Sequence, residues 1–95
     1  MPQPLVFETF AGRVGQEFRI AVDGTASVVA TLTSATPHDA TRVAAGFSLV
    51  FTGPVEPLLP QRIYRMLHGD LGEIDIFIVP IGRDGTGARY EAVFN

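Results

Sequence analysis

The sequence predicts a small all-β domain, built as an antiparallel β-barrel or a two-sheet sandwich of about six to seven strands, mostly in meander order. Three observations lead to this prediction. Segments of alternating apolar and polar residues recur about every ten residues, and glycine or proline stands between many of them. No segment has the periodicity of a long helix. The pattern is densest in residues 60–95, where three strand-like segments follow one another with few residues between them.

Strands are predicted first at residues 5–10, and then at residues 17–22 and 26–33. Residues 17–22 alternate between apolar and polar side chains, as in a strand with one buried face. The Asp23-Gly24 pair predicts a two-residue type I′ turn, because both residue types tolerate a positive φ. The second and third segments are therefore expected to form an antiparallel hairpin.

The longest connection covers residues 34–45 and allows two interpretations. One is a short helical turn over residues 37–44, since proline suits the first helical position and Thr36 can cap it. The other is an irregular loop, and long loops in compact domains are often functional. Strand character resumes at residues 47–52, where every second side chain is apolar and is expected to face the core.

The last third of the chain should form the remaining strands. Residues 62–68 fit a strand or a helix of about two turns, and the neighbouring strands favour the strand. Residues 73–81 are bulky on both faces toward their end, so this strand is expected to be central or covered on both sides there. A glycine-rich loop at residues 82–87 then leads to a final strand at residues 88–94.

Size and charge limit the function classes. The 95 residues make a single domain, 1–95. Only 18% of the residues are charged, which leaves apolar surface and favours a homo-oligomer or a docked subunit. The net charge is -3, and all seven cationic side chains are arginines scattered along the chain. Nucleic-acid binding needs a positive footprint, so no nucleic-acid partner is expected.

The absence of cysteine excludes disulfides and thiolate chemistry. The N-terminal sequence does not have the basic and apolar regions of a signal peptide, and no apolar run approaches about 18 residues. We therefore expect a cytoplasmic protein without a membrane partner. Release as part of a larger particle would leave no trace in the sequence.

A family resemblance runs through most of the chain. Its residues are Phe7, 15–18 (GQEF), 47–54 (FSLVFTGP), 59–64 (LPQRIY), His68, 71–72 (LG), 77–82 (FIVPIG) and 90–95 (YEAVFN). In this order and spacing the chain resembles a bacterial family known as domain of unknown function 6916. Residues 34–45 carry no recognisable part of the pattern. The family brings no established activity, and its members are similar to small proteins found beside phage-tail-collar-like proteins. The resemblance thus implies an accessory or structural part of a tail-like assembly.

Three polar residues within that pattern are candidates for a pocket: Gln61, Tyr64 and His68. On a strand, Tyr64 and His68 share a face but stand about 13 Å apart, too far for a hydrogen bond, whereas on a helix they would meet. The structural interpretation makes Tyr64 a core ring with a satisfied hydroxyl, Gln61 a turn residue and His68 a strand end. The functional interpretation places all three in a ligand pocket.

Other chemical constellations carry less specific patterns. A metal site at His68, Asp70 and Glu73 would have one imidazole and loosely spaced carboxylates. None of the serines stands in a nucleophile-elbow context, and the loop at residues 82–87 has neither the lysine nor the helix of a P-loop. No particular pair of carboxylates points to glycoside chemistry. We therefore predict no catalytic, metal or cofactor-binding residue.

The leading hypothesis is a non-enzymatic structural or interaction protein that assembles with itself or docks on a larger assembly. Terminal strands often lie at sheet edges, so partner contact is expected at the first and last strands. The candidate contact residues are Phe7, Phe10, Arg89, Glu91 and Val93. The alternative is a small-ligand-binding barrel or a minor enzyme that uses a pocket of Gln61, Tyr64 and His68.

Overall fold

The computed structural model describes residues 5–39, 41–42 and 46–95 of the chain. Within these residues, six strands and one five-residue helix follow one another along the sequence. The elements are α1 (Phe7–Ala11), β1 (Glu17–Ala21), β2 (Ser27–Pro37), β3 (Phe47–Gly53), β4 (Arg62–His68), β5 (Gly72–Asp84) and β6 (Gly87–Phe94). The all-β prediction is confirmed.

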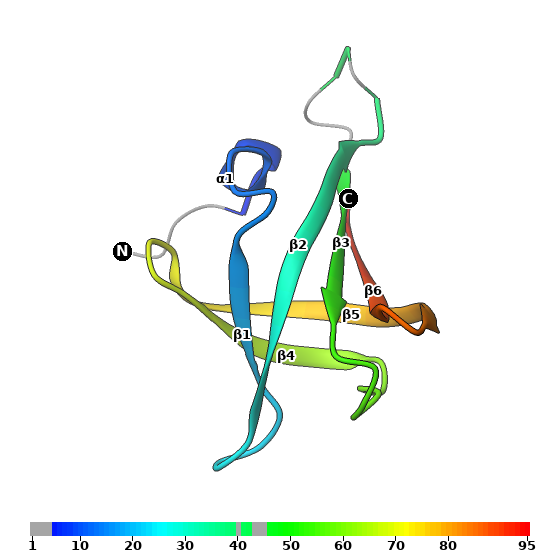
Figure 1. The fold of residues 1–95 in the computed structure, drawn as a ribbon. Helices are drawn as coiled ribbons and strands as arrows, with labels where there is room; N and C mark the ends of the chain where they lie inside the picture. Colours follow the sequence, from blue (N-terminus) through cyan, green and yellow to red (C-terminus); the bar gives the residue numbers. More distant parts are fainter. Residues whose placement is uncertain (1–4, 40, 43–45) are drawn as a thin grey trace.

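The strands form a closed antiparallel barrel in the order β1-β2-β3-β6-β5-β4 (Figure 1). Four of the six strand contacts join consecutive strands as hairpins, as expected for a meander. The other two, β3 with β6 and β1 with β4, close the ring. Of the two predicted architectures, the structure has the barrel.

Every second side chain of the strands faces the barrel interior. The burial pattern of β3 alternates between buried and intermediate residues from end to end, and the first half of β5 alternates likewise. Period-two alternation is what a strand buried on one face requires. The inward-facing residues are Phe18, Ile20, Ala30, Leu32, Phe47, Leu49, Phe51, Tyr64, Met66, Ile74, Ile76, Ile78, Tyr90 and Ala92.

Each end of the barrel is covered by a segment outside the sheet. Helix α1 lies at the upper end in Figure 1, and its Phe10 is fully buried there. The ring of Phe10 lies 6.4 Å from that of Phe18 and 5.9 Å from that of Phe94. At the other end, the connection between β3 and β4 buries Leu59. The barrel core is therefore continuous from α1 to this connection.

The prediction of a strand at residues 5–10 is wrong, because residues 7–11 form α1. Phe7 and Phe10 are three residues apart, so a helix places both rings on one face. Phe7 then packs edge-on against Phe47, at 6.1 Å between ring centroids. Thr9 supports the first turn, since its hydroxyl accepts a hydrogen bond from the Val6 amide at 3.3 Å. The i, i+3 spacing of the two rings suits a helix that buries both of them, although the same residues also alternate as in a strand.

The hairpin between β1 and β2 is confirmed, but its predicted turn type is wrong. The loop covers residues 22–26, and Gly24 is not among the described glycines with a positive φ. The carboxylate of Asp23 closes the loop instead, because it accepts hydrogen bonds from the amides of Thr25 and Ala26 at 2.8 Å. An aspartate side chain bonded to backbone two residues ahead offers an alternative to the tight turn.

Two further predicted boundaries differ from the structure. Strand β2 continues to Pro37, so the helical turn expected over residues 37–44 does not begin there. A turn joins the Arg42 amide to the Asp39 carbonyl at 3.0 Å, and residues 40 and 43–45 lie outside the described residues. The loop expected at residues 82–87 is shorter, because β5 extends to Asp84 and β6 begins at Gly87. Gly87 has a φ of 155°, and a Cβ there would lie 2.8 Å from the Gly53 carbonyl oxygen.

Candidate interaction surface

Tyr64 lies inside the barrel with only 2% of its surface exposed. Its hydroxyl donates a hydrogen bond of 2.6 Å to the carbonyl oxygen of Pro60. Burial raises the pKa of this phenol, so the hydroxyl stays neutral over the physiological range. The hydroxyl of Tyr90 accepts a 2.9 Å hydrogen bond from the Leu59 amide. Both core tyrosines thus fasten the β3–β4 connection across the barrel end.

His68 ends β4 and holds the following turn. Its Nδ1 accepts hydrogen bonds from the amides of Asp70 at 3.0 Å and Leu71 at 3.3 Å. Its Nε2 lies 2.6 Å from the Gln16 amide oxygen. Because Nδ1 accepts, Nε2 carries the proton in this arrangement and donates to Gln16. The imidazole also lies 4.7 Å from the Phe18 ring, so both ring nitrogens and the ring itself make contacts within the fold.

The three predicted pocket residues do not meet in the described structure. Tyr64 bonds to Pro60 and His68 bonds to Gln16, while Gln61 is exposed before β4. His68, Asp70 and Glu73, for which the sequence pattern suggested but did not predict a metal site, are not such a site. In the described part of the chain, no three or more His, Cys, Asp or Glu side chains form a group that could hold a metal ion.

The structure brings together one histidine–serine pair that sequence reasoning did not join. His38 Nε2 lies 2.8 Å from Ser48 Oγ, because β2 and β3 pair Thr36 with Ser48. The pair is exposed to solvent and lies at the end of β2. The neighbouring carboxylate of Asp39 accepts hydrogen bonds from Thr41 instead. The contact fastens the two strands, and only the β2–β3 register could have revealed it.

The candidate contact residues at the two termini have different positions from those expected. Phe7 and Phe10 belong to α1 and to the core rather than to an edge strand. Arg89 and Glu91 lie in the middle of the sheet, since β6 pairs with β3 on one side and β5 on the other. Their assignment to a sheet edge is therefore wrong. Val93 is different, because it pairs with Ser48 of β3 but with no residue of β5.

The barrel has a seam between β5 and β6. The β5–β6 ladder ends at the pair of Val79 with Glu91. Beyond this pair, residues 72–78 of β5 are bonded to β4 alone, and residues 92–94 of β6 are bonded to β3 alone, among the strands that the structure describes. The long strand β5 runs across β6 in Figure 1, which explains why the two strands separate. We call these two stretches, 72–78 and 92–94, the seam.

Exposed apolar side chains lie beside the seam on the outer face of the barrel. Ile63 is 64% exposed, Phe77 is 50% exposed and Val93 is 52% exposed. Ile63 and Phe77 stand directly opposite each other on β4 and β5. The sequence predicts that β5 is central or covered on both sides toward its end. It does lie between β4 and β6, but the exposure of Phe77 and of Ile81, at 52%, shows that its outer face is exposed there. We call these three residues, the Ile63–Phe77 pair on one side of the seam and Val93 on the other, the outer apolar row.

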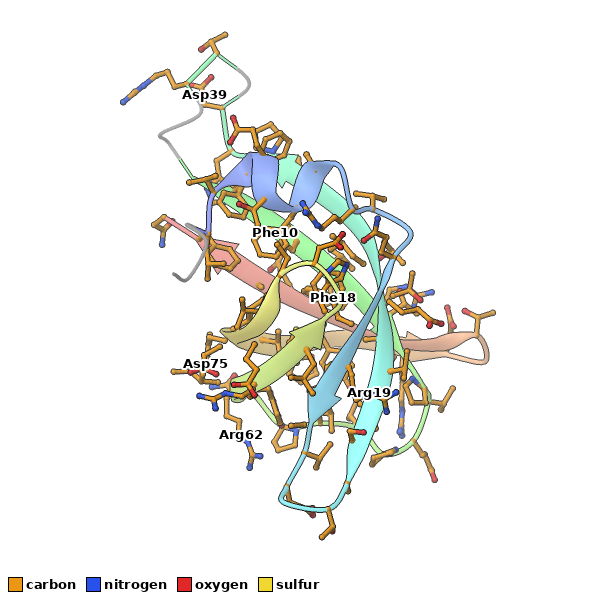
Figure 2. All side chains as sticks on the ribbon, turned by 90° about the vertical axis from the view of Figure 1, so that its left-hand side faces the viewer. Phe10, Phe18, Arg19, Asp39, Arg62 and Asp75 are labelled. Carbon is orange, nitrogen blue, oxygen red and sulfur yellow. The ribbon has the colours of Figure 1, made fainter. Side chains whose placement is uncertain are left out.

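The same outer face of β5 carries two carboxylates that share one cation. Arg65 bonds to Asp75 at 3.0 Å and lies 3.6 Å from Glu73. The hydrogen bond from Arg65 lowers the pKa of Asp75. In Figure 2, Asp75 lies on the outside of the β4–β5 hairpin, away from Phe10 and Phe18. Two carboxylates against one guanidinium leave this part of the surface negative.

The described contacts define a small closed β-barrel whose interior positions hold packed side chains and whose outer face is apolar beside the seam. A family model described as domain of unknown function DUF6916 matches residues 5–94, and the chain belongs to this family. Comparison with curated proteins finds no match, and comparison with solved structures finds none either. In the described residues, the one helix is far too short to cross a membrane.

Proposed function

We propose that this protein is a non-enzymatic interaction protein that docks on another protein through the outer apolar row. The observation that carries the proposal is the contrast between the two faces of the barrel sheet. Inside, the hydroxyls of Tyr64 and Tyr90 are hydrogen-bonded to the backbone of the β3–β4 connection. Outside, Ile63 and Phe77 form an exposed cross-strand pair on β4 and β5. Exposed apolar clusters with a polar surround are typical of protein-binding sites.

The expected setting is a larger assembly in which the domain is an accessory or structural part. The low charged content of the chain, 18%, supports docking because charged residues are depleted at interface centres. Phe77 carries an aromatic ring, and aromatic residues are enriched at interface centres, where they bury a large apolar area. We therefore expect Phe77 to be the anchor of the contact.

The test combines partner capture with size-exclusion chromatography and light scattering. The tagged protein should retain a partner from its own host, or form an oligomer, and Phe77→Ala should lose it. Leu58→Ala is the matched control, since Leu58 is 45% exposed but lies in the β3–β4 connection. A strict monomer that retains no partner at high concentration would contradict the proposal. Equal loss in both variants would also contradict it.

A second candidate function is binding of a small apolar ligand at the α1 end of the barrel. A groove with a volume of about 480 Å³ lies there, within the usual range for ligand pockets. Its lining includes Phe7, Phe47, Phe94 and Asn95. Gln61, Tyr64 and His68 are not among the residues that line this groove. Saturable binding of an apolar fluorescent dye that Phe94→Ser abolishes would favour this function over docking.

A further inference from the structure

Among the described residues, no strand pairs with the backbone edge of residues 72–78 of β5 on the side that faces the seam. They pair with β4 through seven successive residue pairs, from Gly72 with His68 to Ile78 with Arg62. The β5–β6 ladder starts only at Val79. A strand with a neighbour on one side presents alternating N–H and C=O groups on the other. Within the described part of the chain, no strand bonds to this edge.

The side chains of this edge have a regular two-faced order. Ile74 and Ile76 point inward and are buried, and Ile76 is only 1% exposed. Glu73, Asp75 and Phe77 point outward and are exposed. A strand added here would place its inward residues against the isoleucine layer and its outward residues beside the two carboxylates and the phenyl ring.

A second copy of the chain is a poor occupant of this edge. Two antiparallel copies that keep like faces together would have their two-fold axis at residue 74, 75 or 76. With the axis at residue 74 or 75, Glu73 stands against Asp75, or Asp75 stands against its own copy. With the axis at residue 76, Asp75 stands against Phe77 and no like charges are opposed, but neither carboxylate gains a cation from the second copy. Directly opposed like charges destabilise a strand pair. Arg65 is the single cation shared by both carboxylates, as described above.

We propose that the free edge of β5, residues 72–78, binds an extended segment of a partner protein as an additional strand, with basic side chains on its outer face and β-branched side chains on its inner face. The proposal rests on the proposed function and names its binding mode. Backbone hydrogen bonds to the edge supply the register. Arginine or lysine opposite Glu73 and Asp75 balances the remaining negative charge, and an arginine beside Phe77 can stack on the ring.

The experiment uses two synthetic peptides with blocked ends, one of three Val-Arg repeats and one of three Val-Glu repeats, with the full-length protein. Binding is measured by calorimetry, and amide hydrogen exchange is measured with and without peptide. The Val-Arg peptide should bind and slow exchange in residues 72–78. Asp75→Asn and Glu73→Gln should each weaken binding about two- to five-fold, and added salt should weaken it further. The matched control is Glu56→Gln, in the exposed β3–β4 connection, which should bind as the parent does.

The outcomes separate this inference from the proposed function. Binding without slower exchange in residues 72–78, or equal binding of the Val-Glu peptide, would overturn strand addition. If Phe77→Ala still lost a captured partner in that case, docking through the outer apolar row would stand. Self-association that Asp75→Asn strengthens would assign the edge to a second copy and overturn the heterologous partner. Absence of both peptide binding and partner capture would remove both proposals.

Discussion

At the scale of single residues, the two buried tyrosines make opposite kinds of hydrogen bond. Tyr64 donates to a carbonyl oxygen, whereas Tyr90 accepts from the Leu59 amide. A carbonyl oxygen that loses one donor can still accept from other donors through its two lone pairs. A buried amide N–H that loses its acceptor is left without a hydrogen bond. The same loss of one oxygen should therefore have unequal effects at the two positions.

We expect Tyr64→Phe to lower the free energy of unfolding by about 1 kcal/mol, as for an ordinary buried hydrogen bond. Tyr90→Phe should lower the free energy of unfolding by about 1–3 kcal/mol, because it leaves the buried Leu59 N–H without an acceptor. Urea denaturation followed by circular dichroism measures both. An unchanged midpoint for Tyr90→Phe, or a larger loss for Tyr64→Phe, would contradict this assignment of donor and acceptor.

At the scale of elements, two short turns are closed by aspartate side chains, and at the first of them this replaces the predicted type I′ turn. Asp23 closes the β1–β2 loop, and Asp84 closes the β5–β6 turn by accepting from both the amide and the hydroxyl of Thr86. Arg89 bonds to the other oxygen of Asp84 at 2.8 Å. These hydrogen bonds favour the charged carboxylate, so the pKa of both aspartates is lowered in the fold.

A pH dependence follows from that direction. A carboxyl whose folded pKa lies below its unfolded value stabilises the fold above the ordinary pKa, which is 3.8 for aspartate. This stabilisation is lost as the pH falls through the lowered folded pKa. We expect the melting temperature of the parent to decrease when the pH is lowered below about 4. Asp84→Asn should have a lower melting temperature than the parent at neutral pH, and its melting temperature should decrease less on acidification. Melting curves from about pH 2 to pH 7 test this, and parallel curves for the two proteins would contradict it.

Helix α1 is the element that was predicted as a strand. Its role in closing the barrel end can be tested at Phe10. This ring is fully buried and contacts Phe18, Phe47 and Phe94. Phe10→Ala should lower the free energy of unfolding by about 3–5 kcal/mol, through lost burial and the cavity that remains. Phe10→Leu should cost clearly less, since it keeps most of the volume. Equal stability of the alanine variant and the parent would mean that α1 does not close the barrel.

The elements show which features are encoded locally. Alternation predicted the inward faces of β1 and β3, because a strand buried on one face needs a period of two. A five-residue helix leaves only one i, i+3 pair of apolar residues, Phe7 with Phe10, and this pair also fits a short strand. The seam and the His38–Ser48 contact depend on how β5 crosses β6 and on the β2–β3 register. Those features arise from pairings between distant segments, so no local pattern contains them.

At the scale of the whole molecule, one strand divides the inside of the barrel from the surface that we propose for binding. Along β5, Ile76 is buried at 1% exposure and the next residue, Phe77, is 50% exposed. A domain of this size is stable by only about 5–15 kcal/mol, so one buried and unpaired charge can exceed the total. We expect Ile76→Asp to unfold the domain, as judged by the loss of β-sheet circular dichroism and of a cooperative melt.

Phe77→Asp is the matched control, because it places the same side chain one residue further along the same strand. Its carboxylate reaches water, so the variant should fold and melt cooperatively, although it adds a charge beside Asp75. The same variant should lose partner capture, since it removes the aromatic anchor of the outer apolar row. A cooperative fold for Ile76→Asp would mean that the strand faces the other way. Unfolding of both variants would mean that both faces of β5 are covered, and the surface proposed for docking would then belong to the core.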